Sequence, residues 1–358
     1  MIILMTTLSK NSGSVWEDGL VTLREVAKRS GVSIKTVSRI VNNDAGVNAK
    51  TRADVLLHLK SANYVPNQAA RLMRGGASSV FGLMTDAVAT TPYSVDIVRG
   101  AQAALIEKHQ TLLIASTDGD PGREAELWKT FRSHNVAGVI YAAMYHKSHD
   151  VGRPAFGQSI VLANCFAPSG DRPSILPDDE QGGYSQAEHL LKLGHRRIGI
   201  VILHPDIEAT KLRRVGMKRA FADAGVGFHP ELEVRGTAGL LHQETMVAFE
   251  AACELLTAKN RPTAIICGND QIAMQIYSAA ASLGLSIPHD LSIIGFDDLK
   301  LISETLRPQL TTVALPYFEI GKQAVEIMSD SKNHDAEWAP AILVPCPLVE
   351  RSSCRRLN

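Results

Sequence analysis

Residues 77–350 alternate between strand-like apolar runs and amphipathic, helix-like segments, and this alternation constrains the fold more than any other feature. The predicted strands are residues 80–84, 112–115, 139–142, 160–163, 198–203, 264–267 and 293–296. The predicted helices are residues 95–108, 123–134, 182–193, 211–224, 243–256 and 271–283. Strands that alternate with helices form parallel sheets covered on both faces. The segments fall into two series, so the sequence predicts an α/β fold with two lobes and a cleft between them.

The composition is that of an ordinary soluble protein with more than one domain. The chain has 358 residues, of which 45% are hydrophobic and 21% are charged. No apolar run approaches the ~18 residues that span a bilayer, and residues 1–20 lack the pattern of a secretory signal. The five cysteines are odd in number and widely spaced. They are typical of reduced thiols, so we expect a cytoplasmic protein without a membrane partner.

The zero net charge is the sum of two opposite parts. Residues 1–76 hold 11 Lys and Arg against 5 Asp and Glu, a net +6, and residues 77–358 hold 26 against 32, a net −6. A basic segment favours nucleic acid as a partner, but a solvated surface also produces such a bias. The pattern within the basic segment has to decide between the two.

Capping signals predict three short helices in residues 21–66. Thr22 and Glu25 form a capping box, and the helix that follows ends near Gly31. Ser33 caps a second helix from residue 34 to about 42, with Val37, Ile40 and Val41 facing inward. Asn48 caps a third, residues 49–62, expected to bury Val55, Leu56 and Leu59. Two short helices joined by a turn containing glycine predict a helix-turn-helix, and a purely structural bundle is the alternative.

The outer face of the second helix favours DNA binding. Once its core positions are removed, the residues that remain are Lys35, Thr36, Ser38, Arg39 and Asn42. Basic side chains can bond to guanine acceptors in the major groove, and hydroxyls can bond to phosphates. The start of this helix is the end expected to enter the groove.

Residues 21–42, with 47–52 and 63–67, resemble the DNA-binding head of the lactose/galactose repressor (LacI/GalR) family. The order and spacing of many positions agree. The resemblance implies that Ile34, Lys35 and Arg39 contact base edges. It also implies phosphate contacts by the following residues: Thr22, Ser33, Thr36, Ser38 and Asn42.

The segment from Asn67 to Gly76 follows Pro66 and has room for barely two helical turns, which are marginal alone in water. A linker is one interpretation. The resemblance implies instead a hinge helix at residues 67–76 that orders on operator DNA, with Asn67 and Arg71 among its DNA contacts. Met73 takes the place of the family's usual leucine as the apolar wedge in the minor groove.

The body, residues 77–350, also resembles this family, whose effector domains look like bacterial periplasmic sugar-binding proteins. The matching segments are residues 91–100, 189–198, 267–270, 294–298 and 308–312. The resemblance implies that the chain crosses between lobes near Leu176, Thr312 and Asn333. It also places five residues in the effector site: Tyr93, Asn164, Arg213, Asn269 and Asp297. Planar polar side chains suit a polyol, because each can bond two neighbouring hydroxyls.

Three segments, residues 89–97, 160–165 with 177–179, and 344–348, are similar to those of sucrose-operon repressors within the family. The expected function is therefore a homodimeric repressor of sugar-utilisation genes. It would be released from double-stranded operator DNA by a saccharide, with sucrose or another disaccharide favoured. Residues 1–20 are expected to be a disordered extension and residues 351–358 a short tail.

The sequence also bears on three other classes of protein: a corepressor-dependent regulator, a sugar-transport protein and an enzyme. A regulator that uses a nucleobase as corepressor would have the same fold, but Ser94 replaces a frequent second aromatic residue at the effector site. The absent signal peptide and the helix-turn-helix oppose a sugar-transport protein. The acidic runs 178–180 and 297–298 could hold a metal or act as an acid/base pair, but neither has a nearby set of His and Cys residues, and no phosphate-binding glycine motif occurs. We therefore expect no metal, no cofactor and no enzymatic activity.

Overall fold

The computed structural model describes residues 21–41, 44–64, 78–88, 94–151, 159–241, 243–330 and 341–357. The chain divides into two compact units, a head (Met1–Ala77) and a body (Ser78–Asn358). The predicted disordered extension and the predicted hinge helix lie outside the described residues.

The described part of the head contains the three predicted helices: α1 (Leu23–Ser30), α2 (Ile34–Val41) and α3 (Ala49–Ser61). At the start of α1, the Glu25 amide donates to Thr22 Oγ1 at 3.3 Å and the Thr22 amide donates to Glu25 Oε2 at 2.6 Å. These two bonds complete the capping box. Gly31 ends α1 with φ of 67°, a conformation that suits glycine. Asn48 caps α3 by accepting from the Lys50 amide at 2.8 Å.

The core of the head is small and draws on all three helices. Its fully buried members are Val26, Ala27, Val37, Ile40 and Val55, with Leu59 partly buried. The predicted burial of Leu56 is wrong, because its side chain is 49% exposed. Val55 and Leu59 are four residues apart and share one helical face, whereas Leu56 lies about 100° further around the helix.

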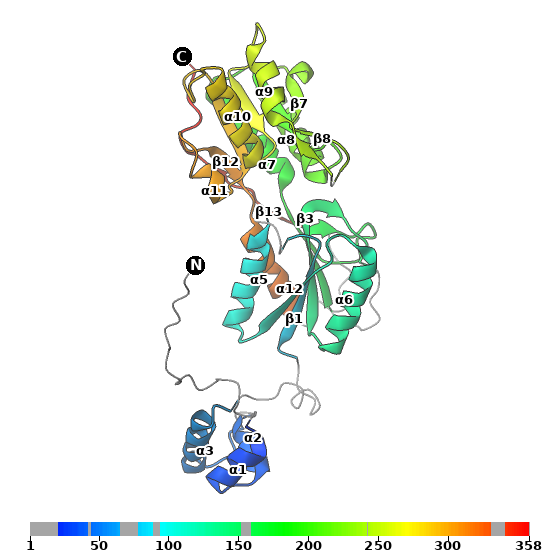
Figure 1. Ribbon diagram of the computed structural model, residues 1–358, viewed down its shortest axis with the longest axis vertical. Coiled ribbons are helices and arrows are strands. Elements are labelled where there is room, and N and C mark those ends of the chain that lie inside the picture. The colour runs from blue at the N-terminus through cyan, green and yellow to red at the C-terminus, as the bar shows by residue number, and fades with distance from the viewer. Residues whose placement is uncertain are drawn as a thin grey trace, which may run out of the picture. The chain divides into compact units, whose positions relative to one another are not determined.

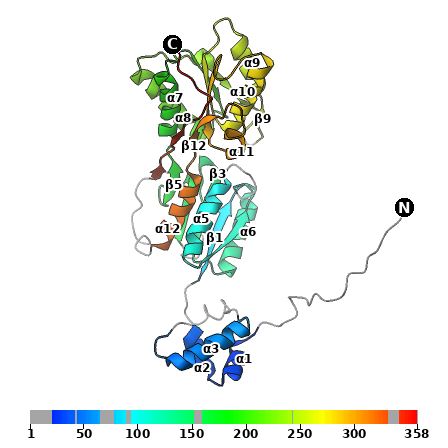
Figure 2. The same ribbon diagram turned by 90° about the vertical axis from the view of Figure 1, so that its left-hand side faces the viewer.

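The first lobe of the body is a six-stranded sheet in the order β13-β5-β4-β3-β1-β2, and in the described residues all its neighbouring strands pair parallel. Helices α5 (Val95–Glu107) and α12 (Tyr317–Ser329) lie side by side on one face, and α6 (Pro121–Ser133) covers the other (Figures 1 and 2). The strands are β1 (Val80–Thr85), β2 (Thr111–Ser116), β3 (Gly138–Ser148), β4 (Ser159–Phe166), β5 (Ser174–Pro177) and β13 (Ile342–Val344).

The second lobe has a similar sheet with the strand order β14-β12-β11-β10-β6-β7, in which β14 pairs antiparallel with β12 and the other neighbours pair parallel. Its core lies on both sheet faces, because alternate residues of one strand point in opposite directions: Ile265 packs with α9 and α10, and Ile266 packs with α7 and α8. The helices are α7 (Asp179–Lys192), α8 (Glu208–Asp223), α9 (Ala248–Thr257), α10 (Asp270–Ser282) and the short α11 (Lys300–Ser303). The strands are β6 (Ile198–Ile202), β7 (Glu233–Arg235), β10 (Ala264–Cys267), β11 (Ser292–Asp297), β12 (Thr311–Ala314) and β14 (Leu348–Val349).

The chain passes between the two lobes three times. The first two passages, after β5 and after β12, agree with the predicted crossings near Leu176 and Thr312. The third prediction, near Asn333, is wrong. Strand β13 still pairs with β5 of the first lobe, so the chain crosses between Val344 and Leu348. A three-residue strand with an exposed Ile342 carries too little periodicity to be predicted.

Helix α12 was not predicted from the sequence. The predicted helix at residues 243–256 begins before the observed start of α9 at Ala248. Residues before Ala248 form a small hairpin of β8 (Thr237–Ala238) and β9 (Thr245–Met246) instead of helix. The last residues, 351–357, pack against the second lobe: the buried Ser353 donates to the Ile293 carbonyl at 2.6 Å and accepts from the Thr311 amide at 2.8 Å.

Two glycines bring α7 and α8 into backbone contact. A Cβ atom at Gly216 would lie 1.8 Å from the Glu180 carbonyl oxygen, and one at Gly183 would lie 2.2 Å from the Arg213 carbonyl oxygen. No other residue fits either position without moving a helix. This close approach sets the first turn of α7 beside the middle of α8, where the functional side chains described next are found.

Candidate functional site

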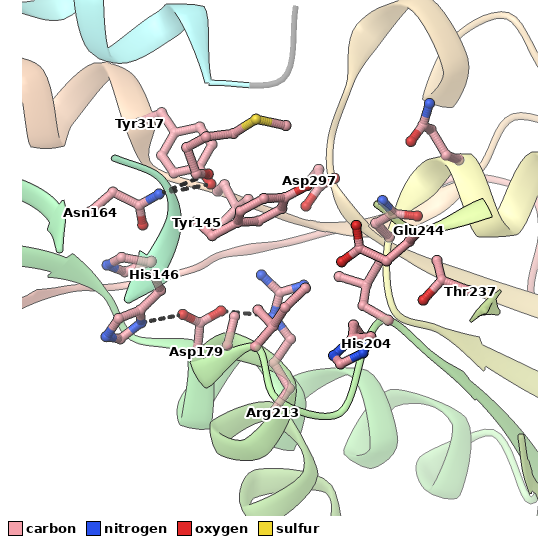
Figure 3. Close-up of a pocket in the computed structure, with 18 of the residues that line it drawn as sticks. Tyr145, His146, Asn164, Asp179, His204, Arg213, Thr237, Glu244, Asp297 and Tyr317 are labelled. Carbon is pink, nitrogen blue, oxygen red and sulfur yellow. Dashed lines mark hydrogen bonds and ion pairs between the residues drawn. The ribbon is translucent and has the colours of Figure 1, made fainter. Parts of the chain in front are cut away.

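A cavity of about 270 Å³ lies between the two lobes of the body (Figure 3). The first lobe contributes the ends of β3 and β4, and the second lobe contributes α8, the start of α10 and the end of β11. Tyr317, at the passage from β12 into α12, adds an aromatic ring. The parallel strands thus deliver their carboxyl ends to the cleft, which is the usual position of a ligand site in open α/β sheets.

Four of the five predicted effector residues line this one cavity: Asn164, Arg213, Asn269 and Asp297. They come from four elements spread over more than 130 positions of sequence. The fifth, Tyr93, lies outside the described residues. The neighbouring Ser94 is buried, and its hydroxyl donates to the carbonyl of the lining residue Met144 at 3.4 Å.

Arg213 is buried and held from three directions. Its Nε donates to Asp179 Oδ1 at 2.7 Å, and its Nη1 donates to the Gly268 carbonyl at 2.8 Å. The guanidinium lies over the Phe296 ring, with its central carbon 3.4 Å from the ring centroid. Burial opposes the positive charge, but the carboxylates of Asp179 and Asp297 outweigh it and raise the pKa of Arg213. The group is therefore a fixed, charged donor.

Asp179 connects the two lobes, and sequence reasoning missed this role. Its Oδ1 accepts from Arg213 of α8, and its Oδ2 lies 2.8 Å from Nδ1 of His146, which belongs to β3 of the first lobe (Figure 3). Burial would raise the pKa of Asp179, but Arg213 and His146 together lower it. The sequence drew attention to Asp179 only as part of an acidic run and of a segment similar to sucrose-operon repressors, and nothing in it pointed to His146.

Asp297 ends β11 in a conformation that few residues other than glycine adopt, with φ of 113°. Burial raises the pKa of its carboxyl to about 7, while Arg213 lowers it and Asp179 raises it further. Near neutral pH this group is therefore present both as an acceptor-only carboxylate and as a carboxylic acid that can donate.

Asn164 presents an acceptor at the cavity. Its Nδ2 donates to the carbonyl of Ala143 at 2.9 Å and to that of Met144 at 3.2 Å, and lies 3.4 Å from the Tyr317 hydroxyl. These carbonyls orient the amide, and Oδ1 has no hydrogen-bond partner among the described residues. The hydroxyl of Thr237, another lining residue, is also buried without such a partner. Buried polar atoms without partners are rare in folded proteins, and these two belong to residues that line the cavity.

Asn269 has a structural task as well. Its Oδ1 accepts from the Ile272 amide at 2.9 Å and so caps α10. The cap does not use the Nδ2 amide, which can donate to a ligand. Sequence reasoning missed several other polar lining residues: Tyr145, His204, Glu244 and Gln271. His204 and Glu244 lie in loops and Tyr145 lies near the end of β3, where no periodic signal marks them, and Gln271 lies in the first turn of α10.

The head presents the predicted face of α2 to solvent. The side chain of Ile34 is 45% exposed despite being apolar, and Lys35 and Arg39 are exposed beside it. Ser33 Oγ accepts from the Thr36 amide at 3.1 Å and lies 2.9 Å from the Thr36 hydroxyl. Thr22 is exposed and Ser38 partly buried. The remaining predicted DNA contacts, Asn42, Asn67, Arg71 and Met73, lie outside the described residues.

Within the part of the chain that the structure describes, no group of three or more His, Cys, Asp or Glu side chains is arranged to hold a metal ion. In the same residues, no helix is long and apolar enough to cross a membrane.

Comparison with known proteins decides the family. A profile described as bacterial regulatory proteins, lacI family, matches residues 22–67, and one described as a periplasmic binding protein-like domain matches residues 187–354. The sucrose operon repressor of Escherichia coli is 32% identical over 338 residues, covering 93% of this chain and all of the repressor. The chain belongs to the LacI family. A LacI-family regulator binds DNA and is not an enzyme, in agreement with the expectation from the sequence.

Solved structures of LacI-family proteins have the same fold over most of this chain. A LacI-family transcriptional regulator from Rhizobium etli is 41% identical, with a TM-score of 0.73, and covers 78% of this chain and 99% of its own. The lac repressor dimer bound to operator and the anti-inducer ONPF is 25% identical, with a TM-score of 0.77, and covers 94% of this chain and all of its own. The predicted architecture, a helix-turn-helix head with a two-lobed body of parallel sheets, is confirmed.

Proposed function

We propose that this LacI-family regulator represses sugar-utilisation genes and leaves its operator when a saccharide occupies the cavity between the lobes. The single observation that carries the proposal is the cavity itself. Its walls bring Asn164 of the first lobe together with Arg213, Asn269 and Asp297 of the second. A ligand that bonds to both walls at once favours one arrangement of the lobes, which is what an effector must do.

The charges of the cavity favour an uncharged saccharide. The cation Arg213 is already paired with Asp179, and Asp297 and Glu244 add acidic groups to the lining. A phosphate or carboxylate on the ligand would meet this excess of acid. Hydroxyls, by contrast, can accept from Arg213 and from the Asn269 amide and donate to Asn164 Oδ1.

The size of the cavity favours a small saccharide. Its volume of about 270 Å³ lies just below the ~300 Å³ at which pockets for drug-sized ligands begin. This space is compatible with a monosaccharide or a disaccharide, but not with a longer saccharide. We favour sucrose or another disaccharide, because the E. coli relative that matches 93% of this chain is a sucrose operon repressor.

DNA binding is assigned to the exposed face of α2, with Ile34, Lys35 and Arg39 at base edges. The acting unit is a homodimer, because two heads are needed for the two half-sites of a palindromic operator. The structurally similar lac repressor binds its operator as a dimer. We place the protein in the cytoplasm, where its operator DNA is found.

The first experiment measures thermal unfolding with a panel of ligands: glucose, fructose, ribose, sucrose, lactose, maltose, sucrose phosphorylated on a primary hydroxyl, adenine and hypoxanthine. A ligand that binds only the folded state raises the melting temperature. We expect a neutral saccharide to give the largest rise. A rise with a nucleobase alone, or with the phosphorylated sugar alone, contradicts the proposal.

The second experiment tests whether the same ligand releases the protein from DNA. Fluorescence anisotropy on a duplex selected from a random library should show release by the saccharide for the wild type and for Arg214→Ala. Arg214 is the neighbouring residue, with its side chain partly exposed and paired to Glu233 at 2.7 Å. Arg213→Ala should bind the duplex and ignore the saccharide.

Because Arg213→Ala removes the cation from the buried Asp179 carboxylate, the double variant Asp179→Asn with Arg213→Gln serves as a second form, in which both charges of this ion pair are removed. It should also bind the duplex and ignore the saccharide. Loss of duplex binding by the folded variants contradicts the assignment of Arg213 to the effector.

A further inference from the structure

In the head, the carboxylate of Asp44 accepts two hydrogen bonds from Arg39, one of the predicted base-contacting residues. Arg39 Nε donates to Asp44 Oδ2 at 2.8 Å, and Arg39 Nη2 donates to Asp44 Oδ1 at 3.3 Å. The two side chains are 43% and 42% exposed, so the pair lies in water at the surface of the head. Exposed pairs of this kind contribute little to stability, and the two-point contact calls for another explanation.

The Asp44 carboxylate is itself fixed by its own loop. Its Oδ1 accepts from the Gly46 amide at 2.8 Å, and the Asp44 amide donates to the Arg39 carbonyl at 2.9 Å. Arg52 of α3 donates to the Asp44 carbonyl. Hydrogen bonds from Arg39, and then from the Gly46 amide, lower the pKa of Asp44 to about 2, so the group is charged at any physiological pH.

The loop backbone lies against the guanidinium at Gly46. A Cβ atom at this position would lie 2.4 Å from Arg39 Nη2 and 3.2 Å from Asp44 Oδ1. The φ angle of Gly46 is not in the left-handed region, so an alanine would leave the backbone unstrained and would push the guanidinium aside. The absence of a side chain at Gly46 thus permits the observed position of Arg39.

We infer that Asp44 is a specificity-determining residue, which aims Arg39 at one base pair and prevents it from acting as a general phosphate anchor. The guanidinium has five N–H groups, and the bond from Nε to Asp44 leaves donors on both Nη atoms for guanine O6 and N7. A side chain held in place before binding loses less conformational freedom on contact with its base. The carboxylate also repels phosphates, which penalises binding in any other register.

This inference rests on the proposed DNA binding by α2. Its consequence is specific: removing the Asp44 charge should strengthen binding to unrelated DNA and weaken discrimination at the base pair that Arg39 contacts. A residue that merely stabilised the head would weaken binding to all sequences alike.

The test uses the full-length protein and a duplex selected from a random library by the wild type. Fluorescence anisotropy then gives dissociation constants for that duplex, for every single base-pair substitution of one half-site, and for a scrambled duplex. Arg39→Ala identifies the base pair at which discrimination depends on Arg39. Asp54→Asn is the matched control: it makes the same charge change in the same head, on α3, where Asp54 lies 4.0 Å from His58.

Asp44→Asn should lose about tenfold in discrimination, which is within the value of one bidentate contact, and only at the base pair identified by Arg39→Ala. Its affinity for the scrambled duplex should rise above that of Asp54→Asn. Gly46→Ala, which keeps every charge and displaces the guanidinium, should lose discrimination at the same base pair.

The inference is overturned if Asp44→Asn matches Asp54→Asn at every base pair, or if its losses are uniform over the half-site. It is also overturned if Gly46→Ala keeps full discrimination. Failure of the wild type to select any duplex would instead overturn the proposed DNA binding, so the two failures can be told apart.

Discussion

His146 Nδ1 of the first lobe lies 2.8 Å from Asp179 Oδ2 of the second, and both side chains are buried. The other oxygen of the same carboxylate accepts from Arg213. One carboxylate thus joins the opposite lobe to the cation that we assign to the effector. A ligand that bonds to Arg213 is therefore only one carboxylate away from the contact between the lobes at His146.

Removing the Asp179 charge should destabilise the body. Asp179→Asn leaves the buried Arg213 without its anion, and breaking a buried pair in this way costs roughly 3–5 kcal/mol. Urea denaturation followed by circular dichroism would measure the loss. The exposed Asp206, 3.7 Å from His204, is the control, and Asp206→Asn should change stability by less than about 0.5 kcal/mol. Equal stability of the two variants would refute the prediction.

Asp297 should make stability fall as the pH rises through neutrality. Its carboxyl keeps a proton in the folded protein up to about pH 7, whereas in the unfolded chain the proton leaves near pH 4. The folded state therefore binds more protons between these values, so the free energy of unfolding decreases across this interval and stays low above it.

Asp297→Asn should flatten that dependence. Melting temperatures between pH 5 and pH 8.5 would be compared with those of the wild type. Burial, and then the charge of Asp297, also raise the pKa of Asp270, so Asp270 contributes in the same direction. The measured quantity is therefore the difference between the wild type and Asp297→Asn. An identical slope in both proteins would show that Asp297 does not titrate in this range.

Gly216 should tolerate no side chain. In Gly216→Ala the new methyl group meets the Glu180 carbonyl of α7 and forces the two helices apart, at a cost of about 1–3 kcal/mol. The same movement should weaken saccharide binding, because Asp179 and Arg213 lie on these two helices. Gly227→Ala, where a Cβ meets open space, is the control. Calorimetric binding and thermal unfolding of both variants would decide the point.

A substitution in the small core of the head should destabilise the head without destabilising the body. Val37 is fully buried among the three helices, and Val37→Ala removes roughly 2 kcal/mol of apolar burial. DNA binding should weaken, while saccharide binding by the body is unchanged, because the chain forms two compact units. Leu57→Ala, at a site that is 68% exposed, should leave both activities intact. A parallel loss of saccharide binding in Val37→Ala would contradict this separation.

Much of the local structure was predictable, because its causes are local. The bonds of the Thr22–Glu25 box and the caps at Ser33 and Asn48 join residues at most three positions apart. β5, β7 and β12 received no strand prediction, but seven other parallel strands, β1 to β4, β6, β10 and β11, are apolar runs and were predicted. The short β13 and the helix α12 were not, and the prediction for Leu56 was wrong, because the burial of such segments depends on the elements that pack against them.

The sequence by itself determined the three capped helices of the head, the alternation that builds the two lobes and the opposite charges of head and body. It also marked Asn164, Arg213, Asn269 and Asp297, through their resemblance to family positions. Only the tertiary structure decided that Asp179 is shared between Arg213 and His146, and that Gly46 makes room for Arg39. Caps and periodicity act over a few residues, whereas these contacts depend on how separate elements meet in space.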